Sequence, residues 1–241
     1  MGLLEGARMS ISIDRARRQL GPALTLAVDP SRITSYATGK LPLVRRARSR
    51  IERFPLPIPR GFSQRLLDRV ARQHPFVLGR DLYPPSWPVA QDPKYLRLID
   101  LVDHLDDPES TSWFTYALQR IEEDGSFRMK DGDVTDADGV RRHLERYLLP
   151  LITDFARDGY RADLDDDPGR ALIGPDGSLH KTNKGAHRFL LARRFGGDPL
   201  LVRVSCVHAD WWHAATRGRS DAERLGSAPD ALREVAEAHQ R

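Results

Sequence analysis

The sequence predicts a mixed α/β fold in which a largely helical first part precedes an α/β core. Apolar residues recur at helical spacing between residues 62 and 158. From residue 170 onward the pattern changes to short strand, turn, helix and buried strand, and the chain ends in one more amphipathic helix. We therefore expect three parts: a basic, proline-punctuated arm over residues 1–60, a helical region packed on the core over 61–158, and the core with its C-terminal helix over 159–241.

The expected arm over residues 1–60 concentrates positive charge. It holds twelve Arg or Lys against four Asp or Glu, a net +8, whereas the whole chain carries +4. Its prolines predict short elements laid over a body, with Phe54–Pro59 extended because a residue before proline avoids the helical region. Such asymmetry indicates an arm that meets nucleic acid or another polyanion, or one that is simply solvated.

Four helical segments are expected in the region over 61–158, separated by a proline-rich break at residues 83–88. Each shows one apolar face. In the third, either of two residues can serve as the N-cap, and in the fourth Pro150 either kinks the helix or starts a second segment. The segments are Phe62–Gln73 with Ser63 as N-cap, Tyr95–Leu105, Ser110–Glu123 capped by Ser110 or Thr111, and Asp136–Asp158 stopped by Gly159.

Strands and one central helix are expected after an acidic, solvated loop at residues 163–169. The dipeptide Asp176-Gly177 is a strong turn signal between two short strands. The expected elements are strand Ala171–Ile173, a return strand Leu179–Thr182, helix Ala186–Phe195 stopped by Gly196 and Gly197, strand Leu200–Val207 and the tail helix Ala228–Gln240.

The turn from Lys184 to Arg188 is the sharpest functional signal in the chain. Backbone N–H groups at a helix start have no intrahelical partner and carry partial positive charge, which suits a phosphate. Gly185 would let the backbone approach the ligand closely, and Arg188 would offer a planar fork to phosphate oxygens. His187 could donate to the same anion or anchor the loop, while Lys184 and Ala186 complete the turn. The structural alternatives, a plain turn and a surface ion pair, stay open.

The stretch from Tyr147 to Trp212 resembles the ParB/sulfiredoxin-like superfamily. The match consists of Asp176-Gly177, the signature Gly185-Ala-His-Arg188 and the hydrophobic strand that follows. The signature is nearest to the Gly-x-His-Arg forms of sulfiredoxins and of a free-serine kinase branch. A His-x-x-Trp pair after the strand, His208 and Trp211, also resembles a group of uncharacterised bacterial proteins. The resemblance implies that the turn binds nucleotide phosphates.

Departures from that superfamily narrow the expectation. Ala186 stands where sulfiredoxins carry cysteine, and thiol chemistry needs a thiolate at the turn. The Glu-Arg pair of partition proteins is absent, and only about thirty residues follow the core. A small-molecule kinase is therefore the best analogy.

We accordingly expect a nucleotide-dependent phosphotransferase acting on a small hydroxyl compound. The nucleotide would be ATP or ADP, possibly CTP, with Mg²⁺ offsetting phosphate charge. Asp176 and His208 are the candidate catalytic residues, and Trp211 a candidate substrate contact. Asp176 and Trp211 each have a structural alternative, turn formation for Asp176 and core packing for Trp211. The alternative function is a non-catalytic nucleotide- or DNA-binding module that uses the basic arm.

The remaining composition sets broad limits. Cys206 is the single cysteine, so no intrachain disulfide forms and a cytoplasmic location is expected. No apolar run approaches the roughly 20 residues that span a bilayer, so no membrane partner is expected. Cys206, His208 and His213 do not match a recognised zinc spacing, so no metal site is expected among them.

Overall fold

The computed structural model describes residues 11–38, 42–53, 60–130 and 132–240. These form two compact units. The first comprises Met1–Trp87, Asp165–Ala186 and Pro199–Arg241, and the second comprises Pro88–Leu164 and His187–Asp198. The units therefore do not follow the three consecutive parts expected, because strands from the first 60 residues belong to the sheet of the first unit.

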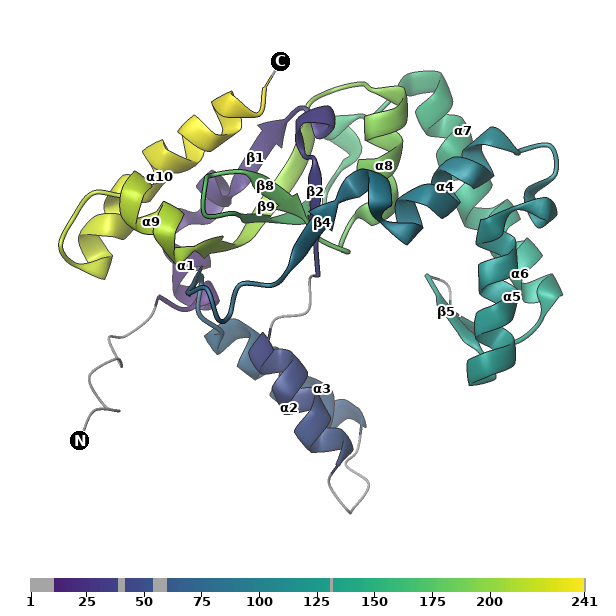
Figure 1. The fold of residues 1–241 in the computed structure, drawn as a ribbon, viewed down its shortest axis with the longest axis horizontal. Coiled ribbons are helices and arrows are strands. Elements are labelled where there is room, and N and C mark those ends of the chain that lie inside the picture. Colours follow the sequence, from purple (N-terminus) through teal and green to yellow (C-terminus); the bar gives the residue numbers. More distant parts are fainter. Residues whose placement is uncertain (1–10, 39–41, 54–59, 131, 241) are drawn as a thin grey trace. The chain divides into compact units, whose positions relative to one another are not determined.

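A seven-stranded mixed sheet is the centre of the first unit, confirming the α/β class (Figure 1). Its order is β1-β9-β7-β8-β2-β4, with β3 also paired to β9. The strands are β1 (Thr25–Val28), β2 (Ser35–Ala37), β3 (Val77–Leu78), β4 (Ser86–Pro88), β7 (Gly169–Ile173), β8 (Leu179–Lys181) and β9 (Leu200–His208). The expected strands of the last third are confirmed, whereas β1 and β2 lie in what was expected to be an arm.

Strand β9 is the longest and pairs on both sides. It runs parallel to β7 and to the short β3, and antiparallel to β1. The register with β7 shifts once: Ala171 faces Val204, but Leu172 faces Cys206. Ser205 is therefore an extra residue in β9, a β-bulge that changes which face the following side chains occupy.

Among the residues that the structure describes, five helices belong to the first unit, and α1, α2 and α9 among them were not predicted from the sequence. The five are α1 (Ile13–Leu20), α2 (Pro42–Glu52), α3 (Arg60–Gln73), α9 (Ala209–Ala215) and α10 (Asp221–Ala238), with short 3₁₀ turns η1 (Gly21–Leu24) and η2 (Pro30–Arg32). Helices α2 and α3 contact each other as a helical hairpin, while the expected extended segment 54–59 lies outside the described residues.

Two expected helix starts in the first unit are wrong. Helix α3 begins at Arg60, so Ser63 lies inside it and is not its N-cap. Helix α10 begins seven residues before Ala228, at a capping box in which the Ser220 hydroxyl accepts from the Glu223 N–H and the Glu223 carboxylate accepts from the Ser220 N–H. Pro229 sits inside this helix and interrupts the sequence pattern that would have revealed it.

The second unit is mainly helical and matches the sequence closely. Thr111 caps α5, Pro150 opens α7 after a π-helical turn, and Gly159 ends α7 with a φ of 71°. The hairpin β5–β6 was not predicted. The elements are η3 (Val89–Gln91), α4 (Pro93–Asp103), η4 (Pro108–Ser110), α5 (Ser112–Asp124), β5 (Phe127–Met129), β6 (Gly132–Val134), α6 (Ala137–His143), η5 (Leu144–Leu148), α7 (Leu149–Asp158), η6 (Ala162–Leu164) and α8 (Ala186–Phe195), whose first residue belongs to the first unit.

Among the described residues, no helix is long and apolar enough to cross a membrane.

Candidate functional site

A tight turn follows the carboxyl end of β7 and carries the candidate catalytic residue Asp176. The turn is closed by backbone bonds from the Gly174 N–H to the Ser178 carbonyl (2.8 Å) and from the Gly177 N–H to the Gly174 carbonyl (3.2 Å). Asp176 Oδ1 accepts from both the N–H (3.0 Å) and the hydroxyl (2.6 Å) of Ser178. Asp176 is therefore both a turn former, as the structural alternative held, and an exposed carboxylate at a strand end.

Polar contacts continue from this turn into the sheet. Ser178 Oγ lies 3.1 Å from His180 Nε2, and His180 Nδ1 lies 2.9 Å from the Tyr83 hydroxyl. Tyr83 is 97 residues away from His180 in sequence. We call Tyr83, His180, Ser178 and Asp176 the hydrogen-bond chain.

Donor and acceptor roles in the hydrogen-bond chain follow from the ionised end. A carboxylate only accepts, so the Ser178 hydroxyl donates to Asp176. Ser178 Oγ then accepts from His180, which places the imidazole proton on Nε2. His180 Nδ1 is left as an acceptor, so the Tyr83 hydroxyl donates to it. All four groups are thereby satisfied in one direction, from the phenol to the carboxylate.

The pKa directions agree with these roles. Hydrogen bonds from the Ser178 hydroxyl and N–H hold the pKa of Asp176 below its ordinary value, which keeps it ionised. Burial lowers the pKa of His180, so the ring is neutral at pH 7, although Asp176 opposes this shift. Burial also raises the pKa of Tyr83, so its hydroxyl stays protonated and remains a donor.

His208, the second candidate catalytic residue, lies beside the hydrogen-bond chain. Its ring packs edge-on against Tyr83, with ring centroids 5.0 Å apart. His208 ends β9 and caps α9, its Nδ1 accepting from the Asp210 N–H at 3.1 Å. The side chain is buried. Its observed roles are thus to start a helix and to hold the Tyr83 ring.

Trp211 lies on α9 next to the same turn. A side chain placed on Gly177 would approach the Trp211 ring at 3.3 Å, so the indole packs on the Asp-Gly turn. Only 7% of Trp211 is exposed. Core packing, the alternative weighed for this residue, therefore accounts for most of its surface.

The signature turn is built at the opposite end of β7. Gly185 has a φ of +71°, and a Cβ there would lie 2.7 Å from Gly169 Cα. The glycine is needed because two backbone segments touch. The close approach expected for a ligand is thus made by the start of β7.

Two lysines hold the signature turn in place. The Nζ of Lys181, a fully buried side chain, donates to the carbonyls of Thr182 (2.7 Å) and Lys184 (2.5 Å). The exposed Lys184 ammonium pairs with Asp167 at 2.8 Å. One positive charge is therefore committed to backbone carbonyls and the other to a neighbouring carboxylate.

His187 and Arg188 belong to the first turn of α8 and to the second unit. Burial, with smaller contributions from Lys94 and His143, lowers the pKa of His187 to about 4. Its ring lies 6.3 Å from that of Tyr147, centroid to centroid. His187 is therefore uncharged at pH 7. Arg188 and Ala186 are both half-buried.

Comparison with known proteins adds no relative. No family model, curated protein or solved structure matches the chain.

Metal ligands are not grouped within the described residues: no three His, Cys, Asp or Glu side chains lie close enough to hold an ion. Cys206 is buried, and burial raises the pKa of its thiol to about 12, so it is a protonated core residue.

The structure thus divides the expected site. Asp176, His208 and Trp211 gather at the carboxyl ends of β7 and β9, while Gly185 lies at the amino end of β7. Four residue steps of β7 separate these ends, about 13 Å at 3.3 Å per residue. Sequence reasoning missed Tyr83, Ser178 and His180. Ser178 and His180 follow Asp176 at alternating positions, a spacing that was visible in the sequence, although only His180 belongs to strand β8.

Proposed function

We propose that the chain is a nucleotide-dependent phosphotransferase that acts on a small hydroxyl compound. The observation that carries the proposal is the hydrogen-bond chain, which ends in an ionised, exposed carboxylate at a strand end. Ligands in α/β folds gather outside such ends. The resemblance of the Gly185–Arg188 signature to nucleotide-binding ParB/sulfiredoxin-like turns supports the choice of a nucleotide as donor.

The proposed reaction is an in-line displacement. The acceptor hydroxyl oxygen attacks the terminal phosphorus of ATP, and the bond from that phosphorus to the bridging oxygen breaks to release ADP. The hydroxyl proton passes to Asp176 Oδ2, since Oδ1 is engaged by Ser178. His180 and Tyr83 act as positioning residues because they fix the Ser178 hydroxyl, which in turn fixes the carboxylate.

Mg²⁺ would be held mainly by the nucleotide itself. The described residues offer no preformed cage for it. A nucleotide-bound Mg²⁺ needs only one or two protein carboxylates beside phosphate oxygens and water. The bound ion would neutralise charge on the transferred phosphoryl group, while Asp176 Oδ2 stays available as the proton acceptor.

Asp176→Asn tests the proposal. It keeps the shape and the turn but removes the proton acceptor, so we expect transfer to fall by at least 100-fold while ATP affinity changes less than 3-fold. Phosphoryl transfer from ATP, ADP or CTP to a panel of small hydroxyl compounds is the measurement. The matched control is Asp198→Asn, which also alters an aspartate that accepts from backbone but lies in the second unit. Absence of transfer and hydrolysis by the wild-type protein would contradict the proposal.

A second candidate function, binding of nucleic acid, is favoured by the α2–α3 hairpin. Residues 42–73 contain nine arginines against one aspartate and one glutamate. Among the arginines of α2 and α3 whose side chains the structure describes, none makes an ion pair. Those whose side chains are exposed are Arg45, Arg46, Arg48, Arg50, Arg65, Arg69 and Arg72. Unpaired arginines on a helical hairpin suit a phosphate backbone.

Salt dependence tests this second function. The double variant Arg65→Gln/Arg69→Gln should weaken duplex binding and reduce the slope of log K against log salt by about 2. The charge-matched control is Arg157→Gln/Arg233→Gln, which alters exposed arginines paired elsewhere. Fluorescence anisotropy between 50 and 200 mM salt measures both. Equal slopes in the two double variants would assign binding to another surface.

A further inference from the structure

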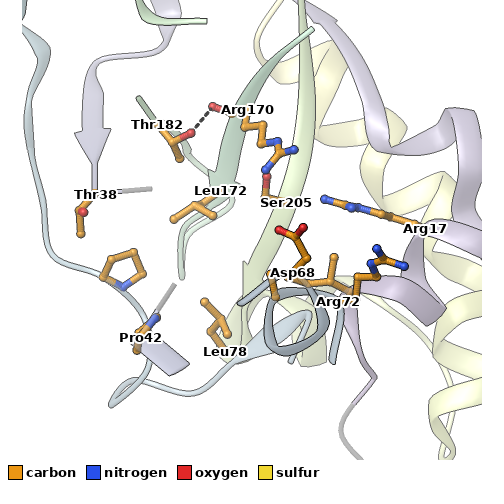
Figure 2. A pocket seen from close by; sticks show the side chains of 13 residues that line it. Arg17, Thr38, Pro42, Asp68, Arg72, Leu78, Arg170, Leu172, Thr182 and Ser205 are labelled. Carbon is orange, nitrogen blue, oxygen red and sulfur yellow. Dashed lines mark hydrogen bonds between the residues drawn. The ribbon is translucent and has the colours of Figure 1, made fainter. Parts of the chain in front are cut away.

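We infer that a cavity lined by Arg17, Arg72 and Arg170 binds the phosphate group of a small ligand. The cavity lies within the first unit and has a volume of about 250 Å³ (Figure 2). We call it the arginine cavity. Its lining residue Arg170 donates its backbone N–H to the carbonyl of Lys184 in the signature turn at 3.2 Å. No local pattern predicted the cavity, because its arginines are 55 and 98 residues apart along the chain.

Three separate elements bring the arginines together. Arg17 comes from α1, Arg72 from α3 and Arg170 from β7. Figure 2 shows the Arg17 and Arg170 side chains pointing toward Ser205. The cavity is thus a meeting point of two helices and the sheet.

Positive charge exceeds negative charge in the arginine cavity. Over the described ranges of the chain, none of Arg17, Arg72 and Arg170 forms an ion pair. The one carboxylate in the lining is Asp68, whose Oδ1 accepts from Gln64 at 2.9 Å. Burial, and then the charges of Arg170 and Arg203, lower the pKa of Arg17. An anion would relieve this repulsion.

A hydroxyl in the cavity lining also lacks a partner. Ser205 Oγ is buried without a hydrogen bond from the described residues. Ser205 is the extra residue of the β9 bulge, and bulges commonly redirect a side chain next to a functional site. A buried hydroxyl is normally satisfied by protein, water or ligand. Its place beside the arginines points to an oxygen-rich ligand.

Phosphate fits this combination best. Arginine forks bind phosphate oxygens in pairs, and a hydroxyl can donate to a further oxygen. Pockets that enclose drug-sized ligands measure roughly 300–1,000 Å³, so the arginine cavity is too small to enclose a whole nucleotide. It has room for the phosphate end, with the remainder of the ligand outside.

The arginine cavity adjoins the hydrogen-bond chain. Leu172, in the cavity lining, is the cross-strand partner of His180. Thr182, also in the lining, directly follows the end of β8, and its hydroxyl donates to the Arg170 carbonyl at 3.1 Å. That the bound phosphate belongs to the donor nucleotide rests on the proposed function. That the cavity binds phosphate does not.

Isothermal titration with ATP, ADP and inorganic pyrophosphate tests the inference. Arg170→Gln and Arg72→Gln should each weaken binding at least 10-fold. Arg72 is exposed on α3, so its variant guards against a folding defect in Arg170→Gln. The control Arg18→Gln removes the neighbouring arginine of α1, which pairs with Asp14 outside the cavity, and should bind as wild type.

The outcomes separate the two proposals. Arginine-dependent binding without phosphoryl transfer would sustain the arginine cavity and remove the proposed function. Phosphoryl transfer with an unchanged KM for ATP in both cavity variants would support the proposed function and contradict phosphate binding in the arginine cavity. No binding of any of the three ligands, or equal binding by all variants, overturns the inference. Binding of pyrophosphate but not of either nucleotide would assign the cavity to a non-nucleotide phosphate.

Discussion

The two ends of strand β7 use polar residues in opposite ways. At the amino end, Lys181 and Gly185 have structural roles. Lys181 donates to two backbone carbonyls, and Gly185 allows two backbone segments to touch. At the carboxyl end, four side chains satisfy one another and still present Asp176 to solvent. The comparison teaches that a turn with the look of a ligand site can be explained by packing, while a reactive arrangement forms between residues far apart in sequence.

Replacing Gly185 with alanine is the strongest way to break this comparison. The substitution meets both a positive φ and a backbone contact at 2.7 Å, so we expect a loss of about 3 kcal/mol in unfolding free energy. Gly196→Ala is the control, because Gly196 also has positive φ but nothing within 4 Å of the added Cβ; its loss should be about 1 kcal/mol. Urea unfolding measures both. An unchanged stability for Gly185→Ala, with loss of nucleotide binding, would return the turn to a ligand role.

Lys181→Met sharpens the same contrast. It leaves the Thr182 carbonyl without its ammonium donor, and we expect a loss of about 2 kcal/mol in unfolding free energy. Lys184→Met removes only an exposed ion pair with Asp167 and should cost less than about 1 kcal/mol. If the two variants lose equal stability, the buried lysine is not what secures the turn.

Acidification tests the carboxyl end. Folding lowers the pKa of His180, so below about pH 6.5 the unfolded chain binds a proton that the folded chain does not. Stability therefore falls as the pH drops through 6.5, and His180→Gln should reduce this slope by at most about 1.4 kcal/mol per pH unit. His187, with a folded pKa of about 4, keeps part of the slope in the variant.

His104→Gln is the control for the acid measurement. The pKa of this exposed histidine is raised, chiefly by its hydrogen bond to the Asp100 carbonyl. His104 therefore stabilises the fold at low pH, and its removal should steepen the acid loss. A slope that does not change in His180→Gln would mean that folding does not lower the pKa of His180, which is incompatible with a ring buried in the neutral form.

Local patterns predicted local structure well. Helix α8 has the expected bounds, and Pro150 and Gly159 act as expected on α7, because spacing and backbone limits operate within a few residues. Strands β1 and β2 were not predicted because they are four and three residues long and are stabilised by strands distant in sequence. The contact between Tyr83 and His180 has no local signature at all. The expected division of the chain differs from the observed units because strands distant in sequence pair in one sheet.

The bulge at Ser205 interrupts the alternation of side chains between the two faces of β9. Before it, Arg203 stands on the same face as Arg170; after it, Cys206 takes that face beside Leu172, and His208 follows two positions later. With strict alternation, His208 would point to the other side of the sheet from Arg203, and away from Tyr83. The bulge thus absorbs one extra residue and keeps Arg203 and His208 on one face of the sheet. Deleting Ser205 would remove the bulge and leave Cys206, Val207 and His208 on the faces that they now occupy.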